Sequence, residues 1–174
     1  MTAVAPVRPA ARRRPGPSDV AEALSPSVRL ARRLAQEAHR DQLDEHGAPL
    51  FDVVERVALD VPESARRTAY LHRICTSGGT RPAQLAALLD LDEEERDALR
   101  LLVRRSGEDV LHVVRRIVAS NEGPCRELAL VVLRAALIGG HAADADERRR
   151  HETALQMIFD AWTHRTAGGR LRLP

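Results

Sequence analysis

The sequence predicts an all-α fold, a bundle of about seven or eight helices. Apolar residues make up 44% of the 174 residues but aromatic residues only 2%, so the core has to be built from Leu, Val, Ile and Ala, which favours helix packing over a sheet. Apolar positions recur every three or four residues, which is the period of one helix face. No convincing strand pattern is present.

Composition also predicts the domain organisation. Residues 1–25 contain several prolines and the triplet Arg12-Arg13-Arg14, with little that is bulky enough to bury. This segment is expected to be a disordered tail. A solvated tail is favoured over one that binds nucleic acid or an acidic partner. Residues 26–164 form the helical domain, and residues 165–174 form a flexible C-terminal tail.

The N-terminal half of the domain divides into three helices at residues that interrupt them. Ser25 and Pro26 open the first helix, and Gly47 and Pro49 follow it. Pro62 separates the second helix from the third, which ends where a glycine pair supplies positive φ. The expected ranges are 25–43, 50–59 and 63–76.

The C-terminal half is expected to contain five helices. Asp92 caps one of them, and the three glutamates after it suit the positive end of the helix dipole. The segment 128–138 is apolar nearly all round, which is typical of the most buried helix of a bundle. The expected ranges are 82–89, 92–105, 108–119, 128–138 and 144–162.

Charge and cysteine content exclude several classes of protein. Every one of the 27 basic side chains is Arg, so Schiff-base chemistry and a P-loop lysine are excluded. With a net charge of +2 and few aromatic residues, nucleic acid is disfavoured as a partner. Cys75 and Cys125 are too few for a disulfide framework or a zinc site, which indicates a cytoplasmic location. No membrane span or secretory signal is apparent.

Three stretches, taken in order, resemble motifs of one enzyme family. These are Ala38-His39-Arg40-Asp41-Gln42 with Gly47-Ala48-Pro49 after it, Ala69-Tyr70-Leu71-His72-Arg73, and Arg104-Arg105-Ser106-Gly107-Glu108. They resemble the HD-domain phosphohydrolases, specifically the bacterial alarmone (guanosine tetraphosphate) hydrolase domains, over about two thirds of the chain. The resemblance implies an HD-domain-like helical bundle and a pocket for a divalent metal and a nucleotide.

Most of the metal ligands that the resemblance implies are missing. The His of the family's His-Pro falls on Val53, the His-Asp pair falls on His72 and Arg73, and the later Asp falls on Val132. Only His72 matches a ligand type. The family's Lys and Asn on the last ligand helix fall on Ala129 and Ala136, on the same face as Val132. A Glu-Asp pair falls on Thr76 and Ser77.

Arg73 also opposes a metal by its charge. A guanidinium stays protonated, and it repels a divalent ion about 4 Å away by about 8 kcal/mol at an effective dielectric constant of about 20. We therefore expect no metal and no cofactor here.

The remaining polar residues each have a functional and a structural interpretation. His72 is either a general base or phosphate contact, or a hydrogen-bonded core residue, which is the commoner role. Arg73 is either a phosphate or carboxylate contact or an ion-pair partner of Asp52 or Glu127. The other three candidates are Arg104 and Arg105, as nucleotide contacts or solvated helix-end residues, and His39, which with Gln42 is expected to join the first helix to its neighbours.

The sequence thus predicts a catalytically degenerate HD-domain protein, a non-enzymatic binding or regulatory module for a nucleotide or a protein partner. The alternative is a metal-dependent nucleotide phosphohydrolase that is still active and has relocated its ligands, with His72 as the remnant.

Overall fold

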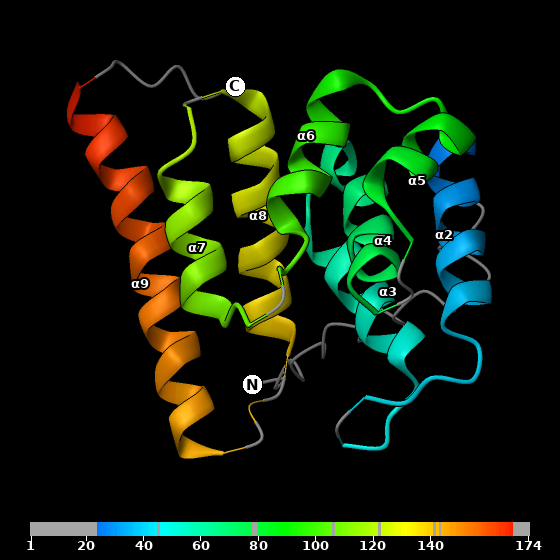
Figure 1. Cartoon of the computed structure of the whole chain (residues 1–174), viewed down its shortest axis with the longest axis horizontal. Coiled ribbons are helices and arrows are strands. Elements are labelled where there is room, and N and C mark those ends of the chain that lie inside the picture. Colours follow the sequence, from blue (N-terminus) through cyan, green and yellow to red (C-terminus); the bar gives the residue numbers. More distant parts are fainter. Residues whose placement is uncertain are drawn as a thin grey trace, which may run out of the picture.

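The computed structural model describes residues 24–44, 46–77, 80–105, 107–121, 123–140, 142 and 144–168. The described residues form eight helices and no strand, apart from one isolated antiparallel bridge between Leu43 and Pro49 (Figure 1). The predicted all-α bundle is confirmed. The helices are α2 (Pro26–Ala38), α3 (Leu50–Asp60), α4 (Glu63–Ser77), α5 (Pro82–Leu89), α6 (Glu93–Leu102), α7 (Val110–Val118), α8 (Pro124–Gly139) and α9 (Ala145–Gly168).

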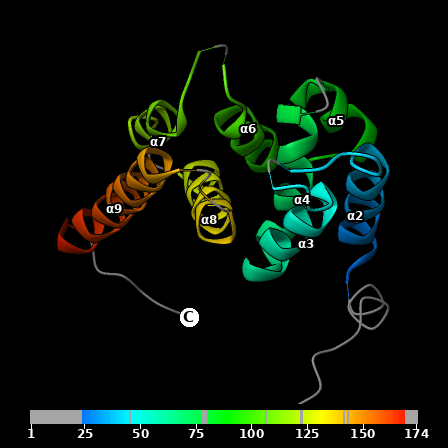
Figure 2. The same ribbon diagram turned by 90° about the horizontal axis from the view of Figure 1, so that it is seen from below.

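Helix α8 occupies the middle of the bundle. It contacts α3, α4 and α6 on one side and α7 and α9 on the other. Seen from below, α7 and α9 form one group and α2, α3, α4 and α5 the other, with α8 and α6 between them (Figure 2). The sequence predicts that the apolar segment 128–138 is the most buried helix. Helix α8 does lie in the middle, but Ile138 near its end is exposed and α4 buries more of its residues.

The core is aliphatic, as the composition requires. Ala129, Leu130 and Val132 of α8 are 0% exposed. Leu71 of α4, Leu99 of α6 and Ile117 of α7 are equally buried, so each helix turns one stripe toward the centre. Tyr70 is the one Phe, Tyr or Trp among the fully buried side chains of the described residues. Hydrocarbon burial therefore holds the bundle together.

Several helix ends differ from the predicted ones for local reasons. Helix α2 ends at Ala38 instead of about residue 43, because the Gln42 side chain donates a hydrogen bond to the Ala38 carbonyl (3.1 Å) and turns the chain. Helix α8 starts earlier than predicted, at Pro124, since proline fits the first helical turn. Helix α9 continues past Trp162 to Gly168.

The expected tails are described only in part. Leu24, near the end of the expected N-terminal tail, is 4% exposed and belongs to the core. The rest of that tail, residues 1–23, and residues 169–174 lie outside the described residues. Among the residues that are described, no helix has the length and apolarity needed to cross a membrane.

Ion pairs with little exposure connect helices that are distant in sequence. Arg32 of α2 donates to Glu55 of α3 (2.7 Å). Arg67 of α4 makes a two-pronged contact with Glu95 of α6, in which Nε lies 2.6 Å from Oε1. The side chains of Arg67 and Glu95 are 16% and 9% exposed. Because removal of one partner would leave a buried charge, such a pair matters more than a surface pair.

We expect the substitution Glu95→Ala to lower the free energy of unfolding by about 3 kcal/mol, because Arg67 would remain buried without its partner. The loss includes the capping contact in which the Glu95 carboxylate accepts a hydrogen bond from the Asp92 amide (3.3 Å). Chemical denaturation of both proteins, followed by circular dichroism, measures the difference.

Asp97→Ala, in the same helix, is the matched control. Asp97 pairs with Arg100 one turn away, and their side chains are 41% and 60% exposed. Its removal should change the free energy of unfolding by less than about 0.5 kcal/mol. Equal losses in the two variants would contradict a structural role for the Arg67–Glu95 pair.

Candidate functional site

A cavity of about 330 Å³ lies where the two groups of helices meet around α8. Its aliphatic wall comes from α3, α7 and α8 and from the end of α6. Its polar side chains come from α4, α9 and the loops after α2 and α6. The aliphatic residues are Val53, Val54, Val57, Leu102, Val110, Val113, Leu133, Ala136 and Leu137, with Gly140 beside them. The polar residues are Asp44, His46, His72, Arg73, Thr76, Arg104, Glu147 and His151.

Helix α4 brings three polar side chains to the cavity. His72 and Thr76 stand one turn apart on the helix, and Arg73 follows His72 directly. The Thr76 hydroxyl donates a hydrogen bond back to the Arg73 carbonyl (3.2 Å), so it is held against its own helix. Arg73 is half-buried, so its charge lies at the border between the core and the opening.

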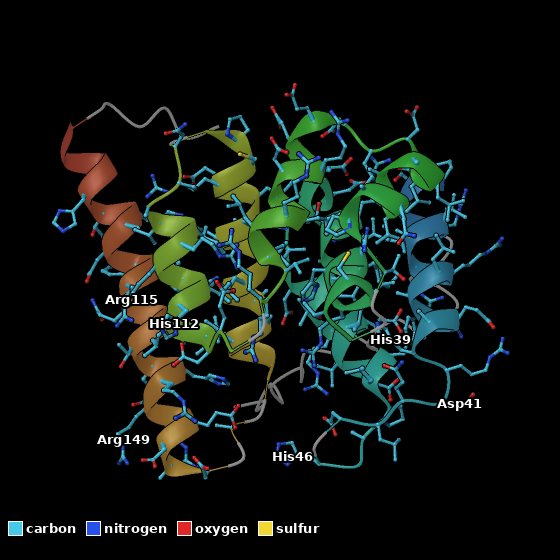
Figure 3. All side chains as sticks on the ribbon, viewed as in Figure 1. His39, Asp41, His46, His112, Arg115 and Arg149 are labelled. Atoms are coloured by element: carbon cyan, nitrogen blue, oxygen red, sulfur yellow. The ribbon has the colours of Figure 1, made fainter. Side chains whose placement is uncertain are left out.

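The loop after α2 brings Asp44 and His46. The Asp44 carboxylate accepts hydrogen bonds from the backbone amides of His46 (2.9 Å) and Ala48 (2.8 Å), which closes a tight turn. Gly47 has a φ of +79° in that turn, a conformation that disfavours other residues. The turn thereby fixes His46 beside the cavity, at the lower edge of the molecule (Figure 3).

The first turns of α9 bring Glu147 and His151 from a distant part of the chain. Asp144 caps this helix by accepting a hydrogen bond from the Glu147 amide (2.7 Å). The predicted start of this helix at residue 144 agrees with this contact. His151 Nε2 lies 3.7 Å from Glu147 Oε1, so the imidazole and the carboxylate face each other along the helix.

His72 is a neutral imidazole at pH 7. It is 7% exposed, and its Nδ1 lies 2.7 Å from the Ala69 carbonyl oxygen. Burial lowers its pKa to about 4, and the nearby Arg73 charge contributes in the same direction. The structure thus places His72 as a buried, hydrogen-bonded residue whose ring also lines the cavity.

His39 lies near His72 but does not line the cavity. Its Nδ1 is 3.0 Å from Gln42 Oε1, and the ring is 1% exposed. Burial lowers the pKa of His39, with a smaller contribution from Arg73. The His39–Gln42 bond lies within the turn that ends α2, and the Gln42 carbonyl accepts a hydrogen bond from the amide of Leu50, the first residue of α3 (2.8 Å).

The two candidate arginines after α6 separate. Arg104 is exposed and lines the cavity, whereas the Arg105 side chain is exposed and outside it. The Arg105 amide donates to Glu108 (2.8 Å), so this residue helps to form the turn before α7. Of the five residues predicted from sequence, the cavity brings together His72, Arg73 and Arg104.

The donor set does not fit a bound metal of the kind the family holds. Val53 and Ala136 line the cavity with methyl groups, and Val132 is fully buried in the core. Within the described ranges, no three His, Cys, Asp or Glu side chains cluster closely enough to hold a metal ion. Apart from His72, the positions where the resemblance places ligands are thus occupied by hydrocarbon and by one guanidinium.

Sequence reasoning missed four polar residues of the cavity: Asp44, His46, Glu147 and His151. None of them stands in a recognisable motif, and Glu147 and His151 are far from His72 in the sequence. The clearest local signal was Asp44 three residues before Gly47, which is typical of a turn closed by an Asp side chain.

No protein-family model matches the chain, and no curated protein matches it in sequence.

The buried neutral state of His72 predicts a pH effect on stability. In the unfolded chain His72 has an ordinary pKa of 6.5, whereas in the folded chain it is about 4. The unfolded state therefore binds more protons between these values, so the contribution is fully present above pH 6.5 and is lost as pH falls toward 4. From pH 7 to pH 5 the free energy of unfolding should fall by about 2 kcal/mol through His72 alone.

Denaturation at pH 7 and pH 5 measures this effect, and His72→Gln should reduce the loss by about that amount. His164→Gln is the control, since His164 is exposed on α9 and outside the cavity. If His72→Gln and wild type lost the same free energy between the two pH values, the buried neutral imidazole would be refuted.

Proposed function

We propose that this chain is a non-catalytic binding module with an HD-like scaffold, in which the cavity beside His72 and Arg73 takes a ligand instead of a metal. The observation that carries the proposal is the cavity itself, an opening of about 330 Å³ at the place where the family resemblance puts the active site.

The lining supports a nucleotide as the ligand ahead of a protein partner. Guanidinium groups of Arg73 and Arg104 suit phosphate or carboxylate oxygens, and the valines of α3 and α7 suit the faces of a flat ring. A protein partner would need a surface, whereas these side chains surround a hollow. Binding in this scheme regulates the protein or its partners by stabilising one form, with no bond made or broken.

Thermal shift of the full-length chain against a panel of guanosine and adenosine nucleotides tests the proposal. A nucleotide at about 100 times its Kd should stabilise the native state by about 2.7 kcal/mol, which corresponds to a rise in Tm of several degrees. Arg73→Ala should abolish the rise, because the guanidinium that faces the ligand would be lost.

Arg115→Ala is the matched control, since Arg115 is exposed on α7 away from the cavity lining. Arg115 is labelled on the outer side of the α7–α9 group in Figure 3. The control variant should keep the full nucleotide effect. If no nucleotide raised the Tm of the wild-type chain, or if Arg115→Ala removed the effect as completely as Arg73→Ala, the proposal would fail.

The second candidate function is hydrolysis of a nucleotide with relocated metal ligands. It is favoured by one observation, that His46, Glu147 and His151 line the same cavity as His72. Purified protein with a stoichiometric transition metal, and release of phosphate or pyrophosphate that His72→Ala abolishes, would support it. Absence of turnover with manganese, magnesium, zinc and iron would remove it.

A cytoplasmic location belongs to the same proposal. Both cysteines are free thiols, Cys75 buried and Cys125 half-buried, which is compatible with a reducing compartment.

A further inference from the structure

The hydrogen-bonding role of the His72 ring is fixed by its own helix. Its Nδ1 lies 2.7 Å from the Ala69 carbonyl oxygen, and a carbonyl can only accept, so Nδ1 carries the proton. In a neutral imidazole the other nitrogen then has a lone pair and no hydrogen. Nε2, on the ring edge away from the α4 backbone, is therefore a hydrogen-bond acceptor.

This acceptor has no donor within the described part of the chain. The only hydrogen bond that the described residues make with the His72 ring is the one at Nδ1. His72 is 7% exposed and lines the cavity, so a donor to Nε2 has to come from the cavity. A lone pair that opens onto the cavity without a protein donor makes His72 a point of recognition.

His39, which lies near His72, also has its proton on Nδ1 and a lone pair on Nε2. The Gln42 amide is oriented by its donation to the Ala38 carbonyl (3.1 Å), so its oxygen faces His39 and the His39 proton lies on Nδ1. His39 Nε2 is buried and has no hydrogen-bond partner among the described residues. This part of the protein thus holds two imidazole acceptors, and neither histidine presents a donor to the cavity.

Arg73 supplies the complementary donor. It follows His72 in the chain and lines the same cavity, and a guanidinium donates hydrogen bonds but never accepts them. An acceptor and a donor that line the same cavity, close enough for the Arg73 charge to lower the pKa of His72, match a ligand edge with the opposite order, an N–H next to a C=O. A bare phosphate offers oxygens alone, which would suit Arg73 but face the His72 lone pair unfavourably.

We infer that the cavity recognises a ligand through a lactam edge, whose N–H donates to His72 Nε2 and whose C=O accepts from Arg73. This inference rests on the proposed binding function and identifies the part of the ligand that contacts His72 and Arg73. Hypoxanthine, guanine and uracil rings have such an edge. In this orientation the base is buried against the valines, and any phosphate lies toward Arg104, which is exposed.

The volume is consistent with one ring system. Ligand cavities range from about 300 to 1,000 Å³, and this one, at about 330 Å³, is near the lower limit. A nucleoside or mononucleotide matches that size better than a highly phosphorylated nucleotide.

Matched pairs of nucleosides test the lactam contact on the full-length chain. The probes are inosine against 1-methylinosine and uridine against 3-methyluridine, because in each pair a methyl group replaces the ring N–H and the neighbouring C=O is kept. Isothermal titration calorimetry should give a Kd for at least one parent nucleoside that is at least about tenfold lower than for its methylated form. Equal binding within both pairs, or no binding of either parent, would overturn the inference.

Two variants assign the contact to His72. His72→Gln keeps an acceptor oxygen and should keep part of the discrimination, whereas His72→Phe has no acceptor and should lose it. If His72→Phe discriminated within a pair as strongly as wild type, the contact would be placed elsewhere and the inference would fail. Circular dichroism of both variants shows whether they are folded. Where His72→Phe is unfolded, His72→Ala, which also lacks an acceptor, takes its place.

A measurement without ligand tests the premise. Long-range proton–nitrogen NMR of the chain labelled with ¹⁵N-histidine should show the His72 proton on Nδ1 at pH 7, the signal being assigned from its absence in His72→Gln. A proton on Nε2 would overturn the inference while the proposed binding function could still be met by a nucleotide in the thermal-shift panel. Failure of the whole panel would remove the proposed function itself.

Discussion

The burial of α8 is the constraint on which the rest of this structure depends. A helix that is apolar nearly all round is stable in water only when other helices cover it, and α3, α4, α6, α7 and α9 do so. Each of these helices carries one apolar stripe, and none could bury that stripe alone. The order of the helices around α8 brings the start of α9 close to α4, so residues far apart in the sequence line one cavity.

Around this apolar centre, charged side chains form hydrogen bonds with helix ends and turns. Arg116 of α7 donates hydrogen bonds to the carbonyls of Leu101 and Val103 (both 2.9 Å), which lie at the end of α6 and lack partners within the helix. The same guanidinium contacts Glu108, so a single side chain joins the end of α6 to the turn before α7. Arginine suits this role because its planar group makes several hydrogen bonds at once and remains charged when partly buried. The exclusive use of arginine among the basic residues of this chain is compatible with this structural role.

Helix number and helix order followed from the sequence because period and breaker residues are local signals. The end of α2 did not, because it depends on where the Gln42 amide finds a partner, and the apolar stripe alone gives no sign of it. His72, Arg73 and Arg104 were found through motif-like stretches that share spacing along the chain. Glu147 and His151 could not be found in this way, since only the packing of α9 against α7 and α8 brings them to His72. The sequence therefore identified one side of the cavity, and the tertiary fold supplied the other.

The side chain that stands beside a buried histidine decides which partners this histidine can take. A neutral imidazole with its Nδ1 proton bound to a backbone carbonyl presents a lone pair, which serves equally well for a metal ion or for a hydrogen-bond donor. Beside a carboxylate the lone pair would favour a cation. Beside Arg73 it faces a positive field, and the walls at Val53 and Ala136 add no further ligand. An uncharged donor group can therefore form a hydrogen bond with His72 without being repelled by Arg73. A carbonyl next to that donor on the same ligand can accept a second hydrogen bond from the Arg73 guanidinium.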